Sequence, residues 1–495
     1  MKSSPSLLFT TFYALGTTVV SGVNQDDKPN IILIVADDQG WGDMGYYGHP
    51  IIQTPNLDEM ANAGIRFDRF YAAAPVSSPT RGSIMTGRHP NRFECFTWGH
   101  ALRPQEVTIA ERLQEAGYST GHFGKWHLGT IYKESPVNPG NSGFHAWLSS
   151  PNFFENDPMM SREGEAVQLK GESSMVTVQS AVDFIEAHAG ADPFFAYICF
   201  GSPHQPHIAK EHDRMSYLYL DDSFQQYYGE LTGMDRAIGV LRNKLRQLGI
   251  DQNTIVWFVS DNGGLRDSSK DPDSGERRYL SSTGGRAYKG SIYEGGLRVP
   301  AIVEWPALIT EPSVTHLPAS TSDIYPTLLE LIGFTGNISY PLDGVSLMPM
   351  IKGETGKREK PIAFWSYPEK GIPVSSEKIM MALKEMQEKG LEITDPALLL
   401  SDAGQIANHY GEEDLKGHAA WLEWPFKLHR IAGKENTVYE LYNLEEDPWE
   451  EYDLSADETH VMESMSKSLL HWMRSVINSM NGKDYKKHKV ESTPI

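Results

Sequence analysis

Four predicted strands, each followed by polar side chains, constrain the fold of this 495-residue chain most strongly. Residues 30–36 read NIILIVA, similar apolar runs lie at 193–200 and 254–259, and a fourth strand is expected at 118–123. Such continuous runs are typical of strands that are buried on both faces. The stretches between them, at 55–63, 108–116, 175–188 and 221–248, predict helices. This alternation predicts an α/β fold with a large, mainly parallel sheet sandwiched by helices.

The polar residues that follow these strands are candidates for one shared site. The carboxyl ends of parallel strands meet at one edge of a sheet, where open α/β folds bind ligands. The residues expected there are Asp37, Asp38, Lys125, His127, His204, Asp261 and Asn262. The three Asp and the Asn offer hard oxygen ligands that suit Ca²⁺ or Mg²⁺, and three carboxylates favour Ca²⁺. The alternative for each of them alone is a strand-end cap or an Asx-turn.

The stretch 75–88, PVSSPTRGSIMTGR, reads as the start of a helix that carries a candidate nucleophile. Pro79 suits the first helical position, and Arg81 lies one turn after Ser77, so its guanidinium can reach the same point. This combination predicts an anion site around the Ser77 hydroxyl, although a capping serine beside a solvated arginine is the plainer alternative. A second glycine-rich stretch, 284–300, presents Lys289 and permits close approach of the backbone to a ligand.

The chain divides into a main unit at 23–360 and a smaller unit at 361–482. Strands at 65–73 and 297–303 and a helix near 323–332 complete the main unit. We expect an α+β subdomain with an antiparallel sheet in the second unit, with strands at 364–367, 424–431 and 438–442, a charged, partly helical segment at 376–417, and a helix over 458–480. Residues 483–495 form a charged tail.

The first 22 residues predict a secretory signal peptide, with Lys2 before a short apolar run and small residues at its end. An uncleaved anchor is the alternative. No later stretch has about 18 uninterrupted apolar residues, so we expect no integral membrane segment and a periplasmic or secreted protein. The net charge of −21 argues against a nucleic-acid partner. Two cysteines, Cys95 and Cys199, cannot build a disulfide framework, and Cys199 lies within an apolar run.

The string that begins at Ser77 resembles the signature of type I sulfatases: Cys or Ser, any residue, Pro, any residue, Arg, and then Thr-Gly-Arg. The resemblance extends over nearly the whole chain and points to the sulfatase branch of the alkaline phosphatase superfamily. It includes Gly-Lys-Trp-His at 124–127, Glu-Gly-Gly at 294–296 and a closing motif, LYNLEEDP, at 441–448. Serine rather than cysteine at position 77 resembles the substrates of radical-based maturases, so a serine-type sulfatase-maturating enzyme is an expected partner.

The resemblance implies a role for each residue of the predicted site. Ser77 is expected to be oxidised to formylglycine (3-oxoalanine), which joins Asp37, Asp38, Asp261 and Asn262 around Ca²⁺. Arg81 would hold the hydrate of the formylglycine, while Lys125 and His127 flank it. His204 and Lys289 would bind sulfate, with His204 protonating the departing oxygen and His127 restoring the aldehyde.

The expected substrate is a sulfated polysaccharide or oligosaccharide. Arg92, Trp98 and His100, in the loop just after the nucleophile helix, are candidates for sugar contacts. Three alternatives stay open: a phosphate or phosphonate ester hydrolase of the same superfamily, a general aryl sulfate hydrolase, and a binding protein without catalysis. Asp261-Asn262, where two-zinc members often have Asp-His, weakens the first of these.

Overall fold

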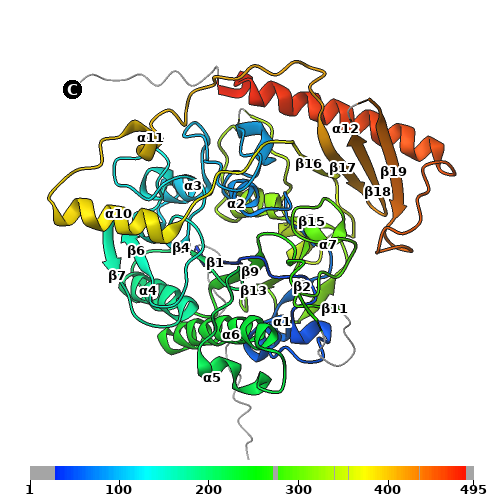
Figure 1. Ribbon diagram of the computed structural model, residues 1–495. Coiled ribbons are helices and arrows are strands. Elements are labelled where there is room, and N and C mark those ends of the chain that lie inside the picture. The colour runs from blue at the N-terminus through cyan, green and yellow to red at the C-terminus, as the bar shows by residue number, and fades with distance from the viewer. Residues whose placement is uncertain (1–27, 271–276, 339, 355, 434, 486–495) are drawn as a thin grey trace, which may run out of the picture.

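The computed structural model describes residues 28–270, 277–338, 340–354, 356–433 and 435–485. A ten-stranded sheet in the order β14-β2-β13-β9-β1-β8-β4-β5-β6-β7 forms the centre of the main unit (Figure 1). Its parallel core consists of β1 (Asn30–Ala36), β4 (Ser119–Lys125), β5 (Ala146–Ser150), β8 (Phe194–Cys199) and β9 (Thr254–Ser260). The prediction of an α/β fold with a large, mainly parallel sheet is therefore confirmed.

Shorter strands extend both edges of the parallel core. On one side lie β13 (Ala301–Glu304), β2 (Ile65–Phe67) and β14 (Ser313–Thr315), and on the other β6 (Met159–Arg162) and β7 (Glu165–Gln168). A small separate sheet contains β12 (Arg298–Val299), β3 (Phe70–Tyr71) and β15 (Ala319–Ser320), and β10 (Ser268–Lys270) pairs with β11 (Arg277–Tyr279).

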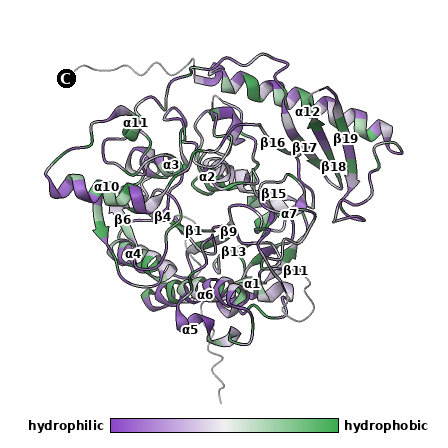
Figure 2. Cartoon of the chain, viewed as in Figure 1, coloured by the Kyte–Doolittle hydropathy of each residue, from purple (hydrophilic) through white to green (hydrophobic). Residues whose placement is uncertain are grey.

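Helices cover both faces of the sheet because alternate residues of each buried strand point to opposite sides. Ile32 and Ile34 of β1 pack with α1 (Pro55–Ala63), α4 (Ser173–His188) and α6 (Asp222–Leu248). Ile31 and Leu33 face α2 (Ser77–Thr86), α3 (Ile109–Glu115) and α8 (Ile324–Leu331). Figure 1 shows these two helical layers, and in Figure 2 hydrophobic and hydrophilic residues alternate along α6, as expected of a helix with one buried face.

The C-terminal region builds a four-stranded antiparallel sheet. Its strands are β16 (Ile362–Ser366), β17 (Gly417–Glu423), β18 (Phe426–Ala432) and β19 (Thr437–Asn443). Helix α12 (Thr459–Met480) packs on one face, where it meets Leu428 and Leu441. The other face packs on Tyr71 and Leu297 of the main unit, so the sheet lies between a helix and the main body.

The segment between β16 and β17 leaves this small sheet and returns to the main body. It contains α10 (Ser376–Glu388) and α11 (Pro396–Leu399), and Met380, Leu383 and Leu399 belong to the main hydrophobic core. Figure 1 shows α10 beside β6 and β7, far from β18. The division of the chain at residue 360 stays a prediction, and the structure adds this excursion to it.

Two predicted strands are interrupted in the structure. The strand expected over 65–73 is divided at Asp68 and Arg69 into β2 and β3, which belong to different sheets. The strand expected over 297–303 is divided at Pro300, which has no N–H to donate to a ladder. The strand expected to begin at Trp424 begins at Phe426, because Trp424 and Pro425 form the turn that joins it to β17, a strand that the sequence analysis did not predict.

Residues 1–22 and 486–495 lie outside the described residues, so the predicted signal peptide and most of the predicted tail have no structural account here. Residues 483–485 form a short 3₁₀ turn after α12. Within the described ranges, no helix has both the length and the apolar character needed to cross a membrane.

Gly124 gives a direct test of the packing around β4. It has a φ of +104°, and a Cβ atom there would lie 1.8 Å from the carbonyl oxygen of Cys199 on β8. We expect Gly124→Ala to lower the free energy of unfolding by at least about 3 kcal/mol, since backbone strain and a clash act together. Gly117→Ala is the control, because its φ is +85° with nothing within 4 Å. That variant should lose only about 1–2 kcal/mol in urea denaturation. Equal losses would contradict this account.

Candidate active site

Ser77 is the first residue of α2, a helix whose ten residues are all buried. The helix thus begins two residues before Pro79, which was expected at its first position, and Pro79 lies within the first turn, where its missing N–H is also tolerated. The chain is fixed just before the helix by Thr80, whose hydroxyl donates to the carbonyl oxygen of Ala74 at 2.7 Å. Gly87 ends the helix in the left-handed conformation. The Ser77 Oγ then lies 3.3 Å from both Asp37 Oδ1 and Asn262 Oδ1. The candidate nucleophile therefore faces the ends of two strands.

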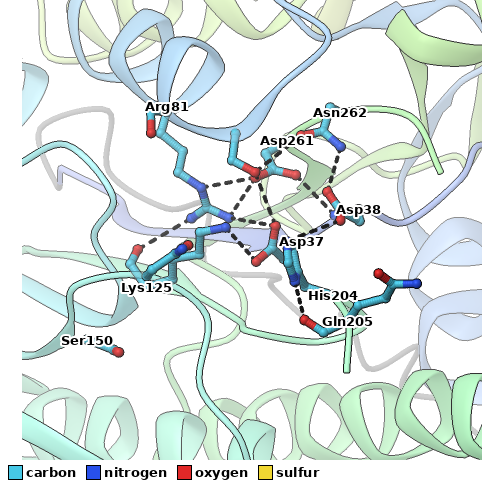
Figure 3. Close-up of polar contacts among 12 residues, drawn as sticks. Asp37, Asp38, Arg81, Lys125, Ser150, His204, Gln205, Asp261 and Asn262 are labelled. Atoms are coloured by element: carbon cyan, nitrogen blue, oxygen red, sulfur yellow. Dashed lines mark hydrogen bonds and ion pairs between the residues drawn. The ribbon is translucent and has the colours of Figure 1, made fainter. Parts of the chain in front are cut away.

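The acidic residues of the site follow β1 and β9, which are neighbours in the sheet. Ala36 pairs with Ser260, so the residues that come next lie side by side. The backbone N–H of Asp38 donates to Asp261 Oδ1 at 3.1 Å, and Asn262 Nδ2 donates to Asp38 Oδ1 at 2.8 Å. Asp37, Asp38, Asp261 and Asn262 have no exposed surface. The structure thus brings together all four predicted oxygen ligands, as Figure 3 shows.

Three basic side chains from separate segments meet the three carboxylates, and Figure 3 labels two of them, Arg81 and Lys125. Arg81 donates to Asp261 Oδ2 from Nε at 3.1 Å and from Nη2 at 2.9 Å. Lys125, the last residue of β4, lies 2.7 Å from Asp37 Oδ2. Lys289 lies 2.6 Å from Asp38 Oδ1. These three positive and three negative charges cancel within a buried space.

The charges shift one another's protonation. Burial acts to raise the pKa of Asp37, but Lys125, His204 and Arg81 outweigh it and hold that pKa below the ordinary value. The pKa of Asp38 is lowered in the same way, with Lys289 as the main opposing charge. Burial lowers the pKa of Lys289, yet Asp38, Asp37 and Asp261 together raise it. Asp37 and Asp38 are therefore ionised and Lys289 is cationic near neutral pH, which is the state that suits binding of a metal ion and an anion.

The two predicted histidines differ in their partners. His127 is 5% exposed, and neither ring nitrogen has a hydrogen-bond partner among the described residues. Burial and the charge of Lys125 hold its pKa well below the usual range, so its imidazole is neutral and able to accept a proton. His204 stacks on Phe153 with ring centroids 4.1 Å apart. Its Nδ1 pairs with the carbonyl oxygen of Gln205 at 2.5 Å, and its Nε2 lies 3.6 Å from Asp38 Oδ2.

These groups face a cavity of about 1,130 Å³ that is open on one side. Ser77, His127, His204 and Lys289 line its inner end. Its outer walls come from Trp98, from the segment 152–159 after β5, and from the segment 373–381 that leads into α10. The cavity is large enough for a group much bigger than a sulfate ion. The candidate catalytic residues and the space for a leaving group thus belong to the same cavity.

The three predicted sugar contacts have different positions. Trp98 lines the cavity and is 41% exposed. His100 does not line it, and its ring nitrogens pair with the carbonyl oxygens of Glu94 and Lys370. Arg92 also lies away from the cavity: it is 2% exposed, donates to Asp343 from Nε at 2.7 Å and reaches Ser479 on α12 at 2.9 Å. Arg92 therefore links its loop to α12. Nothing in the sequence around Arg92 indicates this role.

Apart from Trp98, sequence reasoning missed the outer walls of the cavity. Phe153 follows β5, a five-residue strand whose apolar pattern was too short to be distinguished. Ser376 holds the opposite wall in place, because its hydroxyl accepts from Ser150 Oγ and from the backbone N–H of Asn152, both at 3.0 Å. Asn152 also donates to the carbonyl oxygen of Val374 at 3.0 Å. The walls thus depend on contacts between segments more than 200 residues apart, which no local pattern could indicate.

Comparisons with known proteins agree with this geometry. Residues 29–334 match the family described as Sulfatase. The rat protein named N-acetylgalactosamine-6-sulfatase is 34% identical over 388 residues, which cover 70% of this chain and 70% of that protein. Human arylsulfatase A is 33% identical over 394 residues, covering 71% and 73% of the two chains.

Solved structures resemble the whole fold. The structure titled Ps i-CgsB in complex with k-i-k-neocarrahexaose has a TM-score of 0.73 and 25% sequence identity, and the match covers 93% of this chain and 97% of that one. The phosphonate monoester hydrolase of Agrobacterium radiobacter shares the fold at a TM-score of 0.56, with 19% identity.

The position of Arg92 leads to a test that separates stability from binding. Arg92→Met leaves the Asp343 carboxylate without its main partner, so we expect a loss of about 3–5 kcal/mol in the free energy of unfolding at pH 7. In the unchanged protein burial acts to raise the pKa of Asp343, but Arg92 outweighs it and the pKa lies below the ordinary value. The pair therefore stabilises the fold above that ordinary pKa, and this contribution fades as the pH falls through the folded-state pKa.

In the variant Asp343 can protonate, so the difference in stability should shrink as the pH falls from 7 towards about 4. Urea denaturation at several pH values measures this. A variant with unchanged stability and a raised KM for a saccharide sulfate would instead show that Arg92 binds the substrate.

Proposed function

Because the chain belongs to the sulfatase family and is a sulfuric ester hydrolase, we propose that it removes sulfate from sulfated carbohydrates with a formylglycine made from Ser77 and a bound Ca²⁺. The single observation that carries the proposal is the convergence of the Ser77 hydroxyl, three buried carboxylates and three basic side chains at the inner end of one large cavity. The curated relatives named above support sulfate esters as the substrate class.

The donor set fits a hard divalent cation. Asp37, Asp38, Asp261 and Asn262 present only oxygen and amide groups, without His or Cys among them, and His204 Nε2 also approaches Asp38. Since the buried charges of the site cancel without a metal, a divalent cation would give the site a net positive charge, which favours an anionic sulfate ester. Bound Ca²⁺ would supply electrostatic stabilisation of negative charge that develops on the nucleophile and on sulfate.

The chain's own residues then have separate roles. A formylglycine made from Ser77 would, when hydrated, offer two hydroxyls in place of one, the first for attack on sulfur and the second for release of sulfate. Lys125, Lys289 and Arg81 bind sulfate oxygens and the hydrate and offset their charge. His204 gives a proton from Nε2 to the departing oxygen, because its Nδ1 is already engaged by a carbonyl group. His127, neutral and without a hydrogen-bond partner among the described residues, accepts the proton of the second hydroxyl.

The outer cavity suits a saccharide. Trp98 offers an exposed aromatic face of the kind on which sugar rings stack. Its carbonyl oxygen accepts from the Ile372 N–H at 3.0 Å, and the next residue, Gly99, donates to Ser78 Oγ at 2.9 Å. This connection holds Trp98 close to the nucleophile helix. The periplasmic or secreted location, inferred from residues 1–22, and the serine-type maturase complete the proposal.

The modification of Ser77 is the first test. Protein made in a host without a serine-type maturase should carry plain serine and be nearly inactive but fully folded, because a serine sulfated on Oγ has no second hydroxyl to expel sulfate. Ser77→Cys should restore activity in a host whose maturase accepts cysteine. Mass spectrometry of the peptide that contains Ser77, together with sulfate release, measures both. Multiple turnovers by protein with unmodified serine would sink the formylglycine assignment.

The metal site can be tested without activity. Ca²⁺ at about 100 times its Kd should stabilise the fold by about 2.7 kcal/mol, and Asp261→Asn should abolish most of this gain. Asp43→Asn is a matched control, because Asp43 is equally buried but bonds to Gly40 and Tyr227. It should keep the response to Ca²⁺ although its own stability changes. A full Ca²⁺ response in Asp261→Asn, measured by thermal unfolding, would contradict the site.

The role of His204 can be tested with leaving groups of different quality. His204→Ala should reduce kcat/KM by roughly 10²–10⁴-fold on a saccharide sulfate, whose alkoxide is a poor leaving group. The loss on an activated aryl sulfate should be much smaller, since that oxygen departs without protonation. Matured enzyme and both substrates are assayed in parallel. Equal losses on the two substrates would assign His204 to sulfate binding alone.

A further inference from the structure

The loop that carries Lys289 connects three parts of the molecule. The Lys289 N–H donates to the carbonyl oxygen of Gly264 at 3.0 Å, beyond the end of β9. The N–H of Gly290 donates to the carbonyl oxygen of Pro75 at 2.9 Å, two residues before Ser77. A bond of 2.7 Å from the Gly295 N–H to the Arg286 carbonyl oxygen closes the loop at its base. The shape of residues 286–296 therefore determines where the Lys289 ammonium group meets the site.

Both ends of this loop are held by one residue of the C-terminal region, Glu450. The backbone N–H of Glu294, at the start of α7 (Glu294–Leu297), donates to Glu450 Oε2 at 2.7 Å. Arg286 Nη1 donates to the Glu450 backbone carbonyl oxygen at 2.9 Å. Glu450 has no exposed surface and adopts a φ of +55°, a conformation that is uncommon for glutamate. An unfavourable backbone geometry at a buried charge indicates a site that its surroundings must maintain.

Strand β18 supplies the partners that make this buried carboxylate tolerable. Glu450 Oε1 accepts from Lys427 Nζ at 3.0 Å and from His429 Nε2 at 2.8 Å. Lys427 also donates to Glu294 Oε1 at 2.8 Å. Leu428, between these two residues, points to the opposite face, where it packs in the core beneath α12. One face of β18 thus contacts Glu450 and Glu294, which hold the loop, and the other face packs against α12.

The closing motif at 441–448 explains how Glu450 comes to this place. After β19 the chain turns, and the Asp447 N–H donates to the Asn443 carbonyl oxygen at 2.8 Å. The Asp447 side chain then accepts from the backbone N–H groups of Glu451 and Tyr452 at 2.8 and 2.9 Å. These bonds fix the turn on both sides of Glu450. The motif has no residue at the cavity, so it reaches the site through the 286–296 loop. It does so through Glu450 and through Tyr442, whose hydroxyl accepts from Arg286 Nη1 at 3.1 Å.

We propose that Glu450 is a positioning residue for Lys289, and that the closing motif serves the active site by holding both ends of the 286–296 loop. The proposal rests on the proposed function, in which Lys289 binds the sulfate group. Glu450 touches neither the cavity nor the reacting atoms and acts only through the loop. The small sheet therefore supports the sulfate site from outside the cavity.

The test measures sulfate binding in the full chain, with inorganic sulfate as the probe, in Ca²⁺ buffer, by the rise in thermal midpoint with sulfate concentration. Lys289→Ala should weaken binding, as the proposed function requires. Glu450→Gln should weaken it by about tenfold, the effect typical of residues that orient a ligand-binding group. In the double variant, Glu450→Gln should cause no further loss, because the group it positions is gone.

Leu428→Ala is the matched control. It lies on the same strand and should reduce stability through a core cavity, while sulfate binding stays unchanged. Arg286→Gln, which removes the contact at the other, more exposed end of the loop, gives a second variant if Glu450→Gln folds poorly, and it should weaken sulfate binding several-fold.

The outcomes separate the two proposals. No effect of Lys289→Ala would remove the role of Lys289 and with it that part of the proposed function. A normal response to Lys289→Ala, combined with unchanged binding in both Glu450→Gln and Arg286→Gln, would overturn the positioning role. An equal loss from Glu450→Gln with and without Lys289, or an equal loss from Leu428→Ala, would also overturn it, because the effect would then come from general destabilisation.

Discussion

The pairing of β1 with β9 is the constraint on which the rest of the site depends. It places Asp37, Asp38 and Asp261 side by side in a space without solvent, where ionised carboxylates are costly unless positive charges accompany them. Helix α2, strand β4 and the 286–296 loop each contribute one basic residue. Three segments far apart in sequence are therefore held at one point by the same electrostatic requirement.

Much of this centre could be predicted because its residues follow strands directly. A buried strand fixes the direction in which the chain leaves the sheet, so Asp37 after β1 and Asp261 after β9 had to meet once the strands were adjacent. Lys125 is the last residue of β4 itself, so the predicted strand was sufficient to place it at this edge of the sheet. Ser77 and Arg81 are one helical turn apart, and this local relation can be predicted from the sequence alone.

What the sequence did not predict depends on long-range contacts. Arg92 was expected at the sugar, but its charge is used by Asp343, a residue about 250 positions away. The break at Asp68 arises because the chain moves from one sheet to another, which the apolar pattern does not encode. Helix α10 has an ordinary amphipathic sequence, and only its docking on the main core through its own Met380 and Leu383 turns the preceding residues into a cavity wall. Likewise, nothing near Glu450 in sequence indicates that its partner is Glu294.

The wall at 373–381 lies within the connection between β16 and β17, two strands that pair directly with each other. The residues of this connection that face the cavity can be exchanged while Met380, Leu383 and Leu399 stay in the main core and the buried charges keep their own supports. Chemistry and recognition are thus carried by separable modules of one chain. A protein engineer who wished to redirect the cavity to another saccharide would graft new sequence into this connection and leave the strand ends untouched.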